Sequence, residues 1–184
     1  MLSQDQYEAL LEEIKKEFPD FLMIKKNDSK LMKTIDIFLK IMTFGKMNTF
    51  MEDFITTVGN TVYVNNTWDA RSTSTKAITL RHERVHMRQS KSLGRIKFSL
   101  LYLLLPVPVA FAYYRKKFEQ EAYEESLRAL FEYYGPKFFT QSTKDNVVNH
   151  FTSAEYFWMW PWKKSIEAWY DSAVNEITKS KNHL

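Results

Sequence analysis

Apolar residues recur at helical spacing in the N-terminal and the C-terminal parts of the chain. Residues 4–17 place an apolar stripe on one face, and Pro19 ends this run. Residues 29–43 carry a second stripe, and a last helix is expected over 163–179, close after Pro161. The ordinary role of such stripes is core packing. The stripe residues are Tyr7, Leu10, Leu11 and Ile14 in the first helix, and Leu31, Ile35, Phe38, Leu39 and Met42 in the second.

After residue 52 the pattern changes to that of β-strands. Residues 53–58 and 61–64 are rich in β-branched and aromatic side chains, and Gly59-Asn60 separates them. Two such runs around a Gly-Asn pair predict a hairpin. The polar stretch 65–75 is expected to form a loop that can include a short edge strand. An edge strand can bind an extended peptide by strand addition.

A helix is predicted over residues 76–93, with Gly94 as its C-cap. It carries the most informative motif of the chain, His82-Glu83-Arg84-Val85-His86, which has the pattern H-E-x-x-H. Positions four apart lie on one helix face, so both imidazoles can reach one metal ion. Glu83 can take a proton from a water molecule beside that ion. The motif predicts a zinc-dependent hydrolase, with a peptidase as the leading interpretation; the alternative is a surface helix that carries two histidines by chance.

A catalytic zinc ion also needs a third protein ligand. A second helix, predicted over 115–134, offers Glu119 and Glu121. Two positions correspond to about 200° around a helix, so only one of them can face the site. Glu119, which shares a face with Ala122 and Tyr123, is the first candidate, and Glu121 is the alternative. For both, the competing interpretation is a solvated acidic face of the helix.

These motifs together carry a family resemblance over about residues 53–125. H-E-x-x-H followed by Glu119-Gln-Glu-Ala-Tyr123 resembles the gluzincin metallopeptidases. It is similar to small phage and bacterial proteins with H-E-x-x-H and E-x-E-A-Y, and distantly to the CAAX prenyl-protease family. The resemblance implies that the two motif histidines and Glu119 hold Zn²⁺. Tyr123 stands where the larger proteases have Asp.

The expected reaction is hydrolysis of a peptide bond in a peptide or protein substrate. Glu83 is the expected general base, and it later delivers the proton to the leaving amine. The developing oxyanion needs a donor besides the metal. The candidates for this donor are Tyr123, Tyr113, Tyr114 and His150, of which Tyr123 is the first. A lone histidine such as His150 is more often structural or exposed.

Residues 98–114 form an uncharged segment of 17 residues with basic residues on both sides. This length is at the lower limit for a membrane span. Pro106 and Pro108 interrupt a helix, and a shared metal site requires the chain to return, so a hairpin is predicted. Two interpretations stay open: a buried hairpin that supports the site, and an interfacial loop in peripheral contact with lipid. The flanking basic residues are Arg95, Lys97, Arg115, Lys116 and Lys117.

A second unusual segment, Tyr156-Phe-Trp-Met-Trp-Pro-Trp162, is strongly aromatic. Because aromatic side chains bury large areas, the first interpretation is a lid or plug that packs on the core. A membrane-interface belt and a substrate subsite are the alternatives.

The length of 184 residues suits one domain with one core. The predicted fold class is α+β, mainly helical, with a small hairpin or sheet beside the H-E-x-x-H helix and a second Glu-bearing helix, a minimal zincin-like arrangement. Within this domain, residues 1–45 supply N-terminal helices, 50–135 the zincin core, and 140–184 aromatic-rich C-terminal helices.

Charge and composition narrow the expected partners and location. The net charge of +4 comes from lysines spread along the chain, so no nucleic-acid groove is indicated. The absence of cysteine fits a reducing compartment. The N-terminal residues lack the features of a signal peptide, so a cytoplasmic protein is expected, with membrane association and a phage or bacterial origin as options. Two other functional classes remain: a non-catalytic zinc-binding structural or virion-assembly protein, and a peripheral membrane-binding protein that uses the apolar hairpin.

Overall fold

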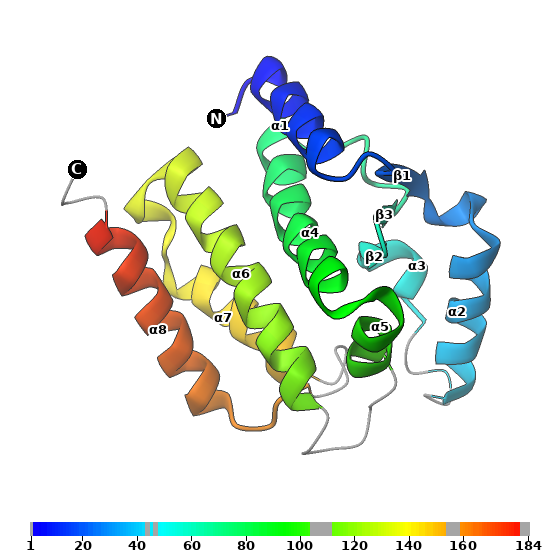
Figure 1. The fold of residues 1–184 in the computed structure, drawn as a ribbon. Coiled ribbons are helices and arrows are strands. Elements are labelled where there is room, and N and C mark those ends of the chain that lie inside the picture. The colour runs from blue at the N-terminus through cyan, green and yellow to red at the C-terminus, as the bar shows by residue number, and fades with distance from the viewer. Residues whose placement is uncertain (1, 43–44, 46–47, 104–111, 154–158, 181–184) are drawn as a thin grey trace. The chain divides into compact units, whose positions relative to one another are not determined.

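The structure is a computed structural model that describes residues 2–42, 45, 48–103, 112–153 and 159–180. Most of the described residues are helical, and three strands form one small mixed sheet, which confirms the predicted α+β, mainly helical class. The helices are α1 (Gln4–Glu17), α2 (Lys30–Met42), α3 (Phe50–Asp53), α4 (Thr73–Leu93), α5 (Arg95–Leu103), α6 (Ala112–Tyr134), α7 (Gln141–Thr152) and α8 (Lys163–Ser180) (Figure 1). The strands are β1 (Leu22–Lys25), β2 (Thr56–Val58) and β3 (Thr61–Val64), and short 3-10 helices occupy Lys26–Asp28 and Pro136–Phe138.

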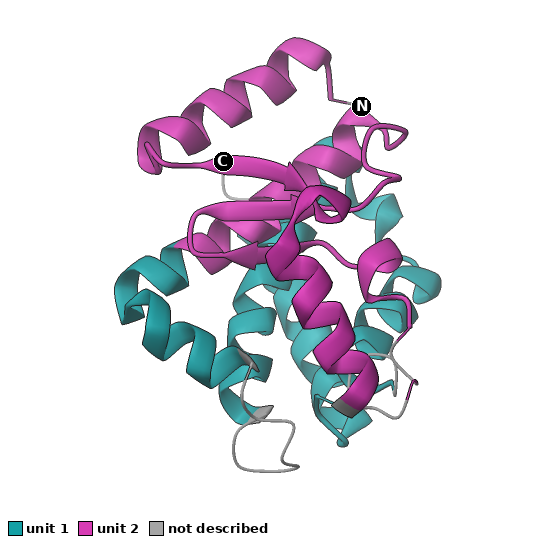
Figure 2. Cartoon of the chain, turned by 90° about the vertical axis from the view of Figure 1, so that its right-hand side faces the viewer, with its two compact units in different colours: residues 1, 88–184 teal, residues 2–87 magenta. Residues whose placement is uncertain are grey.

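The contacts within the chain gather into two compact units, which Figure 2 shows in separate colours. Unit 2 comprises residues 2–87, and unit 1 comprises residue 1 and residues 88–184. The boundary falls inside α4, so this continuous helix contributes its first part to unit 2 and its last part to unit 1. The single domain expected over 1–184 stays a prediction, as do its proposed subdivisions.

In unit 2, the sheet has the strand order β1-β3-β2. β2 and β3 are antiparallel, with Thr57 opposite Val62, and Gly59 in the turn between them has a φ of 61°. Glycine adopts that conformation readily, and the predicted hairpin is confirmed. β1 pairs in parallel with β3, with Leu22 opposite Thr61. The sequence does not predict β1, because its four residues show no alternation of buried and exposed positions.

The predicted helices lie close to the observed ones. α1 has the predicted bounds, and its start is fixed by a capping box in which Ser3 and Gln6 each bond to the other's backbone N–H. α4 and α6 each begin three residues before their predicted starts at Lys76 and Arg115. Gly94 ends α4 with a φ of 84°, as its expected role as C-cap requires.

The predicted core stripe of α2 is partly wrong. Leu31 and Phe38 were expected to pack in the core, but they are 45% and 58% exposed. The buried face instead runs through Met32 and Asp36, so it combines an apolar and a charged side chain. The Asp36 carboxylate accepts a hydrogen bond from Lys40 at 2.7 Å, which compensates part of the cost of its burial. Hydrophobic periodicity alone does not identify such a face.

In unit 1, α6, α7 and α8 pack around a common apolar core. The start of α7 is fixed by Thr140, whose Oγ1 accepts a hydrogen bond from the backbone N–H of Thr143 at 3.2 Å. The sequence indicates helices in 140–184 but does not separate α7, because its first six residues are polar. The fully or nearly fully buried members of this core are Leu127, Val147, Val148, Phe151, Met159, Ile166, Tyr170, Ala173 and Ile177.

The uncharged segment 98–114 is described only at its two ends. Residues 98–103 belong to α5 and 112–114 to α6, and the rings of Phe98 and Phe118 lie 5.1 Å apart between these helices. Pro106 and Pro108 lie outside the described residues, as do Tyr156, Phe157 and Trp158 of the aromatic segment. Among the helices of the described ranges, none combines the length and the apolar character needed to cross a bilayer.

Candidate metal centre

The H-E-x-x-H motif lies in the middle of α4, which is well defined at both ends. Ser72 caps the helix, since its Oγ accepts from the backbone N–H of Thr75 at 3.2 Å. Arg84, inside the motif, binds α1 within unit 2: it contacts Glu17 at 2.6 Å and Glu13 at 3.2 Å. The motif therefore sits on a helix that an ion-pair network holds against its neighbour.

The two motif histidines face each other as the four-residue spacing predicts. Their Nε2 atoms lie 3.2 Å apart, His86 is buried and His82 is half-buried. A tetrahedral zinc ion with two imidazole ligands at about 2.0–2.1 Å would hold these nitrogens about 3.3 Å apart. The observed separation therefore fits two ligands of one such ion.

Glu83 points toward the sheet of unit 2. Its carboxylate is buried, and Oε2 accepts a hydrogen bond from Thr57 Oγ1 of β2 at 2.7 Å. Glu83 and His82 are adjacent in sequence, so they project about 100° apart around α4. This arrangement places a hydrogen-bonded carboxylate next to the histidine pair.

A buried lysine lies in the same part of unit 2. The Lys26 Nζ atom donates to the backbone carbonyl of Phe50 at 2.7 Å and lies 3.6 Å from the centre of that residue's ring. Burial lowers the pKa of Lys26 to about 7, and the negative charges of Glu83 and Asp36 oppose this shift. The ammonium group of Lys26 thus belongs to the electrostatic surroundings of the motif glutamate.

The two candidate third ligands on α6 have different surroundings. Glu119 is buried, and its Oε1 accepts a short hydrogen bond from the hydroxyl of Tyr102 on α5. Glu121 is exposed, and its Oε2 accepts a hydrogen bond from Gln89 Nε2 at 2.8 Å. A difference in burial is the result expected for residues two apart on a helix.

Gln89 also ties α4 to the part of α6 that carries Glu119. It lies three residues after His86 on the same helix, and its Nε2 donates to the Phe118 carbonyl at 3.1 Å as well as to Glu121. Both bonds lie within unit 1. They join the last part of α4 to α6.

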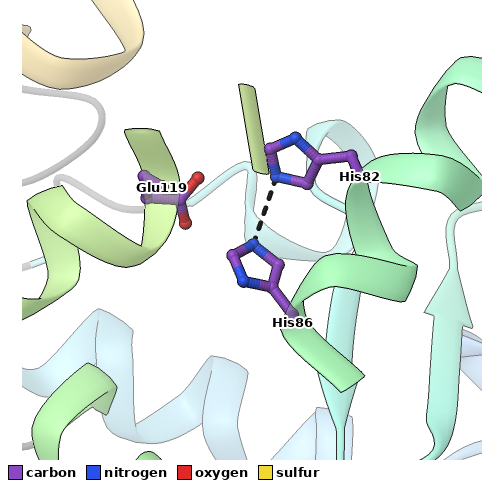
Figure 3. A group of neighbouring side chains, drawn as sticks. All are labelled: His82, His86 and Glu119. Atoms are coloured by element: carbon purple, nitrogen blue, oxygen red, sulfur yellow. Dashed lines mark hydrogen bonds between the residues drawn. The ribbon is translucent and has the colours of Figure 1, made fainter. Parts of the chain in front are cut away.

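His82, His86 and Glu119 form one group of possible metal ligands (Figure 3). Each offers one ligand atom, and the three atoms lie within 4.8 Å of one another. Glu121 is not a member of this group. Imidazole nitrogens and a carboxylate oxygen, without thiolates, form a donor set that suits Zn²⁺ and leaves a position for water or substrate.

The four candidate oxyanion donors have the following surroundings. Tyr123 packs in the core of unit 1, with its ring centre 5.6 Å from that of His150 and 5.4 Å from that of Phe151. His150 donates from Nδ1 to the Asn146 carbonyl of its own helix at 2.6 Å. Tyr113 and Tyr114 are exposed at the start of α6. His150 is not a member of the three-residue group, and a catalytic role for Tyr123 stays a prediction.

Sequence reasoning missed the side chains that hold the motif carboxylates. Tyr102 binds Glu119, and Thr57 binds Glu83, over separations of 17 and 26 residues. A threonine in a strand and a tyrosine in an apolar run have many ordinary roles, so neither gives a local signal. Lys26 was likewise missed, because a buried lysine looks in sequence like any surface lysine.

Comparison with protein-family models, with curated proteins and with solved structures finds no match for this chain. The resemblance to gluzincin metallopeptidases therefore rests on the motif residues alone and stays a prediction.

Proposed function

We propose that the chain is a zinc-dependent peptidase, in which His82, His86 and Glu119 hold the metal and Glu83 is the general base. The observation that carries this proposal is the group formed by the two motif histidines and Glu119, with their ligand atoms within 4.8 Å of one another. Two histidines placed on a surface helix by chance would not predict a third ligand atom at such a distance.

The proposed role of each group follows from its chemistry. When bound, Zn²⁺ supplies Lewis-acid chemistry: it polarises a carbonyl oxygen and lowers the pKa of a water molecule. Glu83 accepts the proton of the attacking water and passes it to the leaving amine. Thr57 orients Glu83 by donating to Oε2, which leaves Oε1 for the water. Tyr102 orients Glu119 in the same way.

The sheet of unit 2 supports a peptide as the substrate class. In the described part of the chain, β2 pairs only with β3, so its other edge has backbone groups available for an added strand. Thr57 belongs to β2 and touches Glu83, so this edge lies next to the proposed base. An extended peptide that pairs with β2 would bring its backbone carbonyls toward the reacting groups.

The test is to replace Glu83 by glutamine and to measure zinc content and turnover together. We expect E83Q to keep about one zinc per chain and to lose at least about 100-fold in turnover of a peptide library, because general acid–base catalysis contributes that much. The matched control is E12Q, the same substitution at an exposed carboxylate of α1 outside the ligand group, which should change neither quantity.

Turnover that survives in E83Q would refute the proposed role of Glu83 as the general base. Zinc bound by the wild type without hydrolysis of any peptide would refute the enzymatic proposal and favour a non-catalytic zinc-binding structural or virion-assembly protein.

A further inference from the structure

A chain of aromatic contacts runs along one end of unit 1. The rings of Trp160 and Trp162 lie 4.8 Å apart, those of Trp160 and Tyr113 lie 6.4 Å apart, and those of Tyr113 and Tyr114 lie 5.7 Å apart. Tyr114 continues the chain to Phe118 at 6.5 Å. These contacts join the start of α6 to the segment that precedes α8, and the starts of both helices lie at the same end of the unit in Figure 1.

The segment before α8 is held in place by hydrogen bonds. The backbone N–H of Trp160 donates to the Phe151 carbonyl of α7, and its indole N–H donates to Ser165 Oγ, each at 2.8 Å. Met159 is buried in the core of unit 1. These contacts therefore hold the backbone that carries Trp160 and Trp162.

Several of these aromatic side chains are exposed, although burial of an aromatic side chain usually stabilises a protein. Tyr113, Tyr114 and Trp162 are 40%, 45% and 50% exposed. α5 adds two further exposed apolar residues, Ile96 and Leu100, on the helix face turned away from the buried Phe98. The exposed rings of Tyr113, Tyr114 and Trp162 belong to the chain of contacts described above, and exposed side chains of that kind in one region usually mark an interaction surface.

Positive charge accompanies the aromatic rings. Residues 88–118 contain seven lysines and arginines and no Asp or Glu. The Lys116 Nζ atom lies 3.9 Å from the Trp160 ring centre and 5.1 Å from that of Tyr113, and Lys117 Nζ lies 5.4 Å from the Tyr113 ring centre. Burial lowers the pKa of Lys116, and Lys117 adds to that shift while Tyr113 opposes it. The two ammonium groups thus lie directly among the aromatic rings.

We propose that this basic-aromatic patch, defined as Tyr113, Tyr114, Lys116, Lys117, Trp160 and Trp162, binds the surface of an anionic lipid bilayer. Trp and Tyr prefer the headgroup region, because one end of each ring system is apolar and the other carries a hydrogen-bonding group. Lysines close to them can bury their methylene stems and keep the charge at the level of anionic headgroups. The binding is peripheral, and it does not depend on the peptidase activity.

Lipid fits this patch better than nucleic acid does. A single-stranded nucleic acid would also use basic and aromatic side chains, but it does not account for the exposed aliphatic residues Ile96 and Leu100, which α5 carries in the same unit. Apolar side chains of that kind, together with aromatic rings and a positive charge, are the usual composition of an interfacial surface.

The test is co-sedimentation of the full chain with vesicles of phosphatidylcholine alone and with vesicles that also contain phosphatidylserine. We expect binding to the anionic vesicles and only weak binding to the neutral ones. K116Q/K117Q should bind the anionic vesicles roughly 25-fold more weakly, from about fivefold per basic side chain near such a surface. The charge-matched control K30Q/K33Q, with both substitutions on α2 of unit 2, should bind like the wild type.

The aromatic part of the patch has its own variant and control. Y113S/W162S should weaken binding to anionic vesicles by at least about tenfold, because two partly inserted aromatic rings are lost. I37S/I41S removes two exposed apolar side chains from α2 and should have no effect. Circular dichroism verifies that all four variants are folded.

The proposal is overturned if the wild type fails to bind anionic vesicles, or if the patch variants bind as well as their controls. Binding of a single-stranded oligonucleotide without binding of vesicles would also overturn it. Because none of these measurements involves zinc or peptide turnover, failure of the peptidase proposal would leave the result unaffected.

Discussion

Replacing Tyr102 by phenylalanine should weaken zinc binding by the proposed centre without disturbing the packing of α5. The substitution removes only the hydroxyl that donates to Glu119 Oε1. The ring keeps its contact with Phe98, whose centre lies 5.5 Å away, and with the Arg115 guanidinium at 5.3 Å.

The size of the expected loss in zinc affinity follows from the burial of Glu119. Its carboxylate is buried, so loss of a donor leaves the oxygen less well oriented and less well compensated. Hydrogen bonds to charged groups contribute about 1.5–3 kcal/mol, and loss of a partner that orients a metal ligand typically costs about 10–100-fold in metal affinity. We therefore expect the Kd of Y102F for Zn²⁺ to rise by about 10–100-fold.

The assay is competition of the metal-free protein with a chromophoric zinc chelator, at fixed pH and ionic strength. The matched control is Y113F, which removes a hydroxyl from an exposed tyrosine of the same unit and should leave the Kd unchanged. A Kd for Y102F within twofold of the wild type would show that the bond between Tyr102 and Glu119 has no part in metal binding. An equal loss in Y113F would show that the effect is not specific to the centre.

Two further predictions concern unit 2. T57V removes the donor to Glu83, so turnover should fall roughly tenfold at unchanged zinc content, whereas T56V, on the opposite face of β2, should have no effect. For the wild type without metal, urea titrations should show an unfolding free energy that rises between about pH 7 and pH 10, by up to ~1.4 kcal/mol per pH unit from Lys26. In K26M, the contribution of Lys26 to this rise in unfolding free energy should be absent.

The sign of the Lys26 effect follows from its lowered pKa. Burial lowers the pKa of Lys26 from 10.5 to about 7 in the folded chain. Below that pH the lysine is protonated in both states, and the folded state carries the cost of a buried ammonium. At higher pH the unfolded chain binds more protons than the folded chain, so stability increases until the ordinary lysine pKa is reached. A K26M profile with the same slope as the wild type would contradict this origin.

Local periodicity predicted the parts of the candidate site that depend on one helix at a time. The four-residue spacing places the two histidines together, and the two-residue spacing separates Glu119 from Glu121, as the structure shows. Both results need only the geometry of an α-helix. That Glu119 and the two histidines come together needed the motif resemblance as well.

The parts that sequence reasoning missed depend on contacts between distant elements. The bonds of Tyr102 to Glu119 and of Thr57 to Glu83 form only when the fold brings two elements together. The buried face of α2 is another case, because Asp36 is buried there while Phe38 is exposed. In each case the decisive interaction is polar and non-local, and hydrophobic periodicity carries no information about it.

The most direct test of the central claim is zinc stoichiometry by elemental analysis of the wild type beside H86A, E119A and E121A. The proposed centre predicts about one zinc per chain in the wild type and in E121A, and almost none in H86A and E119A. A wild type that takes up no zinc on reconstitution, or a chain that loses zinc with Glu121 but keeps it without Glu119, would contradict the centre described here.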